Sequence, residues 1–273
     1  MRIRQALPGI LGRQYPVART NYPLLTVLYL LRMKDVDAVP IFPMARRGAR
    51  AVLGFSVLPH LMKLGPNGFA NFVRGPCEGA SDELSLLGIQ DDLEALLEAF
   101  EARRLGFALV RDPRQAEKAS LASLADVLSL YGKGGIRSNL TVGDVGTPVF
   151  SMPSDSSIRD ALQQMFRHRH RRVFLSGEST YVSDRGILGY LFSPSILGEL
   201  GTDETLDPLS KPIGEVEKST PATIDSHKGL ELAALKLKEE RGGCLVTDDQ
   251  RVVTPWDVVM KPWLSGELAT ATS

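Results

Sequence analysis

The sequence predicts an α/β (α+β) fold built from four β-α-β-β-α repeats. Four segments have the i, i+3, i+4, i+7 apolar pattern of an amphipathic helix, and they begin at Leu24, Leu93, Ile158 and Leu230. Fifteen residues after each of these positions an apolar strand begins or is under way, at residues 39–42, 108–110, 173–175 and 245–246. Because a helix and a strand recur four times at one offset, the chain is predicted to be a repeat protein.

The other elements of each repeat follow from the residues around these helices. A short strand precedes each helix, at residues 17–19, 84–87, 149–152 and 222–224. A second strand and a second helix close each repeat, at 50–53 with 57–64, 119–121 with 124–131, 187–192 with 194–200, and 251–253 with 255–260. One repeat has too little core to fold alone, so we expect the first to pair with the second and the third with the fourth.

Turn-forming residues mark the connections between the repeats. Residues 132–139 are rich in glycine and are predicted to be a flexible linker and the main boundary. Residues 64–81 and 201–212 join the repeats of each half, 177–186 form a polar hairpin loop, and the tail 265–273 is predicted to be disordered. The repeats are therefore assigned to residues 1–66, 67–134, 140–202 and 211–264.

Composition narrows the class of protein. The 273 residues contain 32 Lys and Arg against 32 Asp and Glu, so bulk charge gives no indication of a nucleic-acid partner. Two cysteines, Cys77 and Cys244, are too few for a disulfide framework and favour a reducing, cytoplasmic setting. No apolar stretch is long enough to span a bilayer, and the N-terminus lacks the apolar run of a signal peptide.

The fourth repeat contains a distinctive helix start. Val252 and Val253 form a short strand, Thr254 stands at the N-cap position, and Asp257 follows at the spacing of a capping box. The free N–H groups and positive dipole end of such a helix attract an anion, and one hydroxyl and one carboxylate stand beside them. These groups suit a phosphate together with a sugar diol, although the same residues also make a good helix cap without any ligand.

Two further segments carry a family resemblance. Residues 141–148 (TVGDVGTP) and 211–216 (KPIGEV) resemble the opening of CBS (cystathionine-β-synthase-type) motifs, and the repeat order and the Thr254-x-x-Asp257 ending match as well. The resemblance implies four CBS motifs, forming two pseudo-symmetric Bateman modules, as in stand-alone archaeal CBS proteins and the gamma subunit of AMP-activated protein kinase. It further implies a regulatory protein that binds AMP, ADP or ATP.

The resemblance also implies which residues contact a nucleotide. Thr254 and Asp257 of the fourth motif, and Ser123 and Asp126 of the second, match the Ser/Thr that contacts phosphate and the Asp that holds the ribose. The third and first motifs depart from this pattern, with Phe192 and Ser195, and with Val57 and His60, in the two places. We therefore expect one competent site per pair.

Basic and apolar residues provide further candidates. By resemblance, Arg171 and Arg172 stand where many members of the family grip phosphate, and Arg103 and Arg104 occupy the comparable helix end. The basic run that contains Arg171 and Arg172 is equally explained as a solvated helix C-terminus. The adenine slot of the fourth motif is assigned to strand residues that could equally be ordinary core: Ala222, Ile224, Cys244 and Val253.

Nothing in the sequence indicates an enzyme or a metal site. There is no phosphate-binding glycine loop or nucleophile elbow, and the four histidines form no ligand cluster. The favoured interpretation is a regulatory adenine-nucleotide-binding protein that modulates an unidentified protein partner and needs no cofactor. A ligand-free scaffold or homodimerisation module and a nucleic-acid-binding protein are the alternatives.

Overall fold

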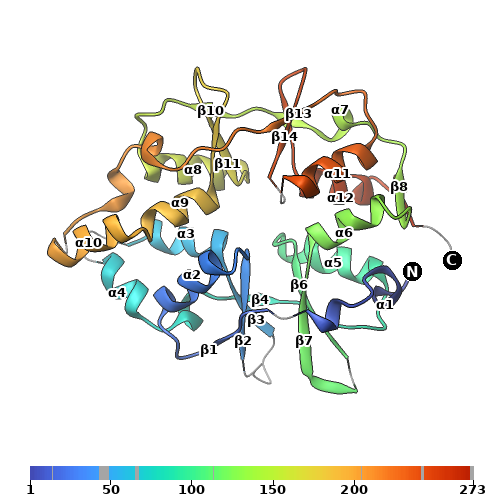
Figure 1. The fold of residues 1–273 in the computed structure, drawn as a ribbon, viewed down its shortest axis with the longest axis horizontal. Helices are drawn as coiled ribbons and strands as arrows, with labels where there is room; N and C mark the ends of the chain where they lie inside the picture. Colours follow the sequence, from blue (N-terminus) through green and yellow to red (C-terminus); the bar gives the residue numbers. More distant parts are fainter. Residues whose placement is uncertain are drawn as a thin grey trace. The chain divides into compact units, whose positions relative to one another are not determined.

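The computed structural model describes residues 1–13, 15–42, 49–64, 68–112, 114–203, 205–240 and 243–270. The chain divides into two compact units, each built from segments far apart in the sequence (Figure 1). Unit 1 comprises Met1–Gln14, Leu84–Val149 and Pro221–Ser273, and unit 2 comprises Tyr15–Glu83 and Phe150–Thr220. Unit 1 therefore holds the second and fourth repeats, and unit 2 holds the first and third.

Each repeat contributes a small mixed sheet in which the first strand is parallel to the second and the third is antiparallel to it. The strands are, in chain order, β1 (Ala18–Arg19), β2 (Ala38–Phe42) and β3 (Ala49–Leu53); β5 (Leu86–Gly88), β6 (Phe107–Asp112) and β7 (Gln115–Ser123); β10 (Ser151–Met152), β11 (Arg172–Leu175) and β12 (Tyr181–Ser183); β13 (Ala222–Ile224), β14 (Leu245–Thr247) and β15 (Arg251–Val253). Two sheets gain a fourth strand, β4 (Asp82–Leu84) beside β3 and β9 (Thr147–Pro148) beside β15.

In every repeat one helix lies between the first and second strands and another follows the third strand. This β-α-β-β-α order confirms the predicted fold class. The first helices are α2 (Leu24–Met33), α5 (Leu93–Arg103), α8 (Ile158–His168) and α11 (Leu230–Glu239). The second helices are α3 (Gly54–Met62), α6 (Leu124–Tyr131), α9 (Asp184–Leu191) and α12 (Pro255–Leu264). All four residues of each apolar pattern are buried, so the periodicity identified the core faces correctly.

Helix packing explains why the compact units differ from the consecutive pairs expected from the sequence. In unit 1, α6 lies against both α11 and α12. The Tyr131 hydroxyl at the end of α6 donates a buried 2.9 Å hydrogen bond to the Val258 carbonyl oxygen in α12. In unit 2, α3 packs on α8 and α9. These contacts bury apolar helix faces from alternate repeats in a shared core, which short-range sequence patterns do not reveal.

The third repeat departs from its predicted elements. Residues 187–192 were expected to form a strand, but they belong to α9 apart from its C-cap Phe192. The true third strand is β12, which has only three residues and follows a short turn, so the expected hairpin loop over 177–186 is wrong as well. A separate helix, α10 (Pro194–Thr202), occupies the stretch expected for the second helix. In the first repeat, α3 begins three residues before the expected start at residue 57.

Two segments predicted to be flexible are paired with each other. Residues 136–138 of the expected linker form β8 (Ile136–Ser138), which is antiparallel to β16 (Leu268–Thr270) in the expected disordered tail. Ile136 is fully buried, and this burial anchors the pair. Residues 271–273 of the tail lie outside the described residues. The connection over residues 64–81 also contains α4 (Gly68–Arg74) and the 3-10 turn η2 (Cys77–Ala80).

Short elements complete the two units. In unit 1, α1 (Ile3–Ala6) packs on α5 and the 3-10 turn η1 (Ile10–Gly12) packs on β7, which brings the N-terminal segment to the second repeat. The remaining elements are α7 (Val142–Val145), η3 (Pro208–Ser210) and η4 (Ile213–Glu215). Cys77 and Cys244 are buried thiols. Every helix among the described residues is too short or too polar to cross a bilayer.

Candidate functional site

Three carboxylates are buried in the described part of the chain, and all three lie in the first turn of a second helix. They are Asp126 in α6, Asp184 in α9 and Asp257 in α12, with exposed fractions of 7%, 4% and 6%. A buried carboxylate is costly unless it is hydrogen-bonded and paired with a cation. Each of these three has a cationic partner, so the starts of the second helices are the polar centres of the two units.

In the fourth repeat, Asp257 holds the start of α12 through a capping box. Its Oδ2 accepts hydrogen bonds from the Thr254 backbone N–H at 2.9 Å and from the Thr254 hydroxyl at 2.7 Å. Its Oδ1 lies 2.9 Å from Nζ of Lys261, one turn further along the helix. Lys261 also donates to the Val145 carbonyl oxygen. One oxygen therefore caps the helix while the other neutralises a cation.

The second repeat reproduces this arrangement at α6. Oδ2 of Asp126 accepts from the Ser123 backbone N–H at 2.8 Å and from the Ser123 hydroxyl at 3.0 Å. Oδ1 pairs with the guanidinium of Arg13, which follows η1 in the N-terminal segment. The two repeats thus build the same constellation from a hydroxyl, a carboxylate and a cation, although the cations come from different parts of the sequence.

The third repeat uses its buried carboxylate differently. The Ser183 hydroxyl caps α9 by accepting from the Gly186 N–H at 3.0 Å, and no carboxylate stands at the third helical position. Asp184, at the first position, instead accepts from the Arg171 guanidinium at 2.6 and 2.8 Å. Burial lowers the pKa of Arg171, but Asp184 and Asp37 more than offset this, so its pKa lies above the ordinary value.

These contacts correct the residues assigned to the third and first repeats. Strand register places Leu53, Ser123 and Ser183 equivalently, each opposite the first residue of its neighbouring strand. The helix cap of the third repeat is therefore Ser183 rather than Phe192, and that of the first is Leu53 rather than Val57. The polar pair Ser183-Asp184 just before the apolar residues of α9 was the signal that could have located this helix start.

Three of the four residues assigned to the adenine slot lie at one end of the fourth sheet. Ala222 and Val253 both pair with Leu245, the first residue of β14, and Cys244 directly precedes this strand. Val253, Cys244 and Ile224 are at most 5% exposed, and Ala222 is partly buried against the core of unit 1. The sheet therefore places Ala222, Cys244 and Val253 beside the start of α12, whereas Ile224 pairs with Thr247 at the other end of the sheet. All four residues contribute to the core or lie against it.

The basic residues assigned to phosphate are divided among several environments. Arg171 lies 5.4 Å from the ring centre of Phe55, besides its pair with Asp184. Arg172 lies over the Tyr181 ring at 6.0 Å. Arg104, in the left-handed conformation at the end of α5, pairs with Glu101 at 3.6 Å. Arg171 and Arg172 belong to unit 2, whereas the other predicted site residues belong to unit 1.

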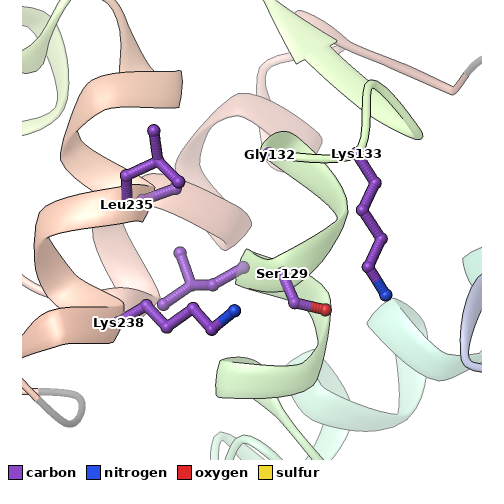
Figure 2. A pocket seen from close by; sticks show the side chains of 7 residues that line it. Ser129, Gly132, Lys133, Leu235 and Lys238 are labelled. Carbon is purple, nitrogen blue, oxygen red and sulfur yellow. The ribbon is translucent and has the colours of Figure 1, made fainter.

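Unit 1 also contains a small cavity between α6 and α11, shown in Figure 2. Its volume is about 140 Å³, which is far below the ~300–1,000 Å³ of ordinary ligand pockets. Ser129, Lys133, Leu235 and Lys238 line it, and the Ser129 hydroxyl already donates to the Asp126 carbonyl oxygen at 2.6 Å. Among the described residues no group of three or more His, Cys, Asp or Glu side chains is arranged to hold a metal ion.

Comparison with known proteins gives matches in structure only. No family model matches the sequence, and no curated protein matches it. The fold is similar to that of a Methanocaldococcus jannaschii protein proposed as an archaeal homologue of g-AMPK, with a TM-score of 0.80 and 15% identity over 96% of this chain and 100% of that one. It is also similar to an uncharacterized conserved protein from Pyrococcus horikoshii, with a TM-score of 0.53 and 11% identity over 94% and 98% of the two chains.

Proposed function

We propose that this chain, which has the fold of a four-motif CBS protein, is a non-catalytic regulatory module that binds an adenine nucleotide. The observation that carries the proposal is the matched pair of constellations, Ser123 with Asp126 and Thr254 with Asp257. Both lie where a third strand passes into a second helix, and both keep a buried carboxylate in the same geometry. Two independent caps would not need the same buried acid, since an exposed one caps a helix equally well.

The chemistry of each constellation suits a nucleoside phosphate. The free N–H groups at the start of α6 or α12 and the adjacent hydroxyl attract a phosphate oxygen. The carboxylate accepts charge-assisted hydrogen bonds from the two hydroxyls of a ribose. When a ribose takes Oδ1 of Asp257, Lys261 is released from its pair and becomes available to a phosphate, and Arg13 stands in the same relation to Asp126.

The comparison with the Methanocaldococcus jannaschii protein supports this proposal, because that protein is itself compared with g-AMPK. We infer a regulatory role from the effect that a bound ligand would have on helix packing, not from catalysis. A ligand that contacts the start of a second helix changes the packing of that helix, and a partner protein that binds one packing better than the other reads the change.

The test is a thermal-shift titration of the full chain with AMP, ADP, ATP, NADH and S-adenosylmethionine, followed by calorimetry. A ligand that binds the folded state raises the melting temperature with concentration. We expect an adenosine ligand to do so in the wild type and to a smaller extent in Asp257→Ala, in which the constellation of Ser123 and Asp126 is intact. Asp144→Ala is the matched control, because Asp144 makes the same capping box with Thr141 at the start of α7. No shift with any of these ligands would overturn the proposal and favour a ligand-free scaffold.

A further inference from the structure

Unit 2 contains a large apolar groove beside its helices. The cavity has a volume of about 1040 Å³ and is lined on one side by α2 and on the other by α9, α10 and the segment near η4, which are labelled in part in Figure 1. We call it the α2–α9 groove. Its apolar lining includes Leu25, Leu28, Tyr29, Leu188, Phe192 and Leu197. A groove of this size and lining is typical of a binding surface rather than of a packing defect.

An exposed apolar stripe runs along α2, and two of its three residues, Leu25 and Tyr29, line the groove. Leu25, Tyr29 and Met33 follow one another at four-residue spacing, so they share one face of the helix. Tyr29 is 60% and Met33 is 61% exposed, the highest values among the large apolar side chains that the described residues expose. Tyrosine and methionine are enriched at protein interfaces, and exposing them beside an open apolar groove indicates a covering partner.

The charges around the groove favour a basic partner. Its lining contains five carboxylates, on Asp35, Asp37, Asp184, Glu215 and Glu217, against three guanidinium groups, on Arg32, Arg171 and Arg185. Two of the arginines are held by carboxylates of the groove itself, Arg185 by Asp35 at 2.5 Å and Arg171 by Asp184 at 2.6 Å. Outside these two pairs the lining holds three exposed carboxylates, on Asp37, Glu215 and Glu217, against one guanidinium group, on Arg32, so the groove has a net negative charge.

We propose that the α2–α9 groove is the docking site for a basic amphipathic helix of a partner protein. The apolar face of such a helix would cover Leu25, Tyr29 and Leu188, and its lysine or arginine side chains would meet Glu215 and Glu217. An amphipathic helix lying in an apolar groove is a recurrent mode of recognition. The proposal stands on unit 2 alone and does not depend on nucleotide binding by the residues of unit 1.

Gly189 offers a substitution that fills the groove without disturbing the core. It lies in α9 and lines the groove, and apart from its chain neighbours and the adjoining backbone of α9 no atom lies within 4 Å of the position its Cβ would occupy. A tryptophan there enters the groove, while an alanine leaves the groove open. Gly198 in α10 is equally open and does not line the groove, so Gly198→Trp is the matched control for an added aromatic ring.

The experiment measures fluorescence anisotropy of a labelled leucine–lysine peptide with helical spacing, titrated with the full chain. Its counterpart has glutamate in place of lysine. We expect the lysine peptide to bind wild type, Gly189→Ala and Gly198→Trp alike, and Gly189→Trp at least tenfold more weakly. The glutamate peptide is expected to bind at least tenfold more weakly than the lysine peptide, with the difference narrowing at high salt.

Several outcomes would overturn the proposal. They are no binding of the lysine peptide, equal binding of both peptides, or unchanged binding by Gly189→Trp with native circular dichroism. Analytical sedimentation tests whether a second copy of this chain, rather than a partner helix, covers the groove. A wild-type dimer that Gly189→Trp converts to a monomer would show that the groove is covered by a second copy of this chain, which contradicts a basic partner helix.

Discussion

Replacing Asp257 by alanine separates the capping role of this residue from its proposed role in binding. The substitution removes the acceptor for two hydrogen bonds at 2.7 and 2.9 Å and the partner of Lys261 at 2.9 Å. Loss of the cap costs about 1 kcal/mol, and loss of charge-assisted hydrogen bonding at a buried site adds about 1–2 kcal/mol. The Lys261 side chain is 35% exposed and keeps its hydrogen bond to the Val145 carbonyl oxygen, so the substitution does not leave a buried, unpaired charge.

We therefore expect the free energy of unfolding to fall by about 2–3 kcal/mol in Asp257→Ala, a drop of about 5–10 °C in the melting temperature. The carboxylate of Asp144 is exposed, so Asp144→Ala should lose only about 1 kcal/mol. We expect binding to respond differently, because in the proposed complex both ribose hydroxyls donate hydrogen bonds to the Asp257 carboxylate. Losing about 3 kcal/mol of binding free energy weakens Kd about 100-fold.

The assay is calorimetric titration of both variants with the adenosine ligand that raises the wild-type melting temperature, at a temperature where all three proteins are folded. Affinity should fall in Asp257→Ala and stay unchanged in Asp144→Ala. Wild-type affinity in Asp257→Ala would refute the site assignment. An equal loss in both variants would show that helix stability, rather than the carboxylate, controls binding.

Three further substitutions or conditions test the packing. Tyr131→Phe removes the 2.9 Å hydrogen bond to Val258 and should lower the free energy of unfolding by about 1 kcal/mol in urea titrations; no change would mean that this bond does not hold α6 to α12. Gly106→Ala should cost about 1–3 kcal/mol by calorimetry, because φ is +68° and the new Cβ would lie 2.7 Å from Cδ1 of Leu124; a neutral result would contradict this backbone. Burial raises the pKa of the Cys77 thiol in the folded state. The stability that the buried neutral thiol contributes is therefore fully present below the unfolded pKa of about 8.5, and it is lost as the pH rises through the higher folded pKa. A disulfide reagent at pH 8 should label the buried thiols of Cys77 and Cys244 far more slowly in the native chain than in guanidinium, and two fast native thiols would show that they are accessible.

Sequence patterns predicted the elements whose signals are local. The apolar periodicity that begins at Leu24, Leu93, Ile158 and Leu230 gave the starts of all four first helices. The capping boxes of Ser123 and Thr254 were also predictable, because a hydroxyl and a carboxylate three residues apart suffice to form them. That these residues bind a nucleotide stays a prediction.

The prediction for the third repeat was wrong because two local sequence signals competed. The apolar residues 187–192 resemble a strand by hydrophobicity, and the three-residue strand β12 is too short to give an alternating pattern. The strand and the helix start were settled by register, since Val173 pairs with Val182 and Arg172 with Ser183. This pairing moved the cap nine residues from its expected position at residue 192.

The sequence by itself determined the repeat, the amphipathic helices and the two hydroxyl–carboxylate pairs, since each depends on residues only a few positions apart. Tertiary structure alone decided which repeats share a core and which cation faces each buried carboxylate. Arg13 reaches Asp126 across 113 positions, and Arg171, a phosphate candidate by resemblance, pairs with Asp184 in this structure. The physical reason is that burial of a carboxylate demands a nearby cation, and the fold selects that cation by distance in space rather than along the chain.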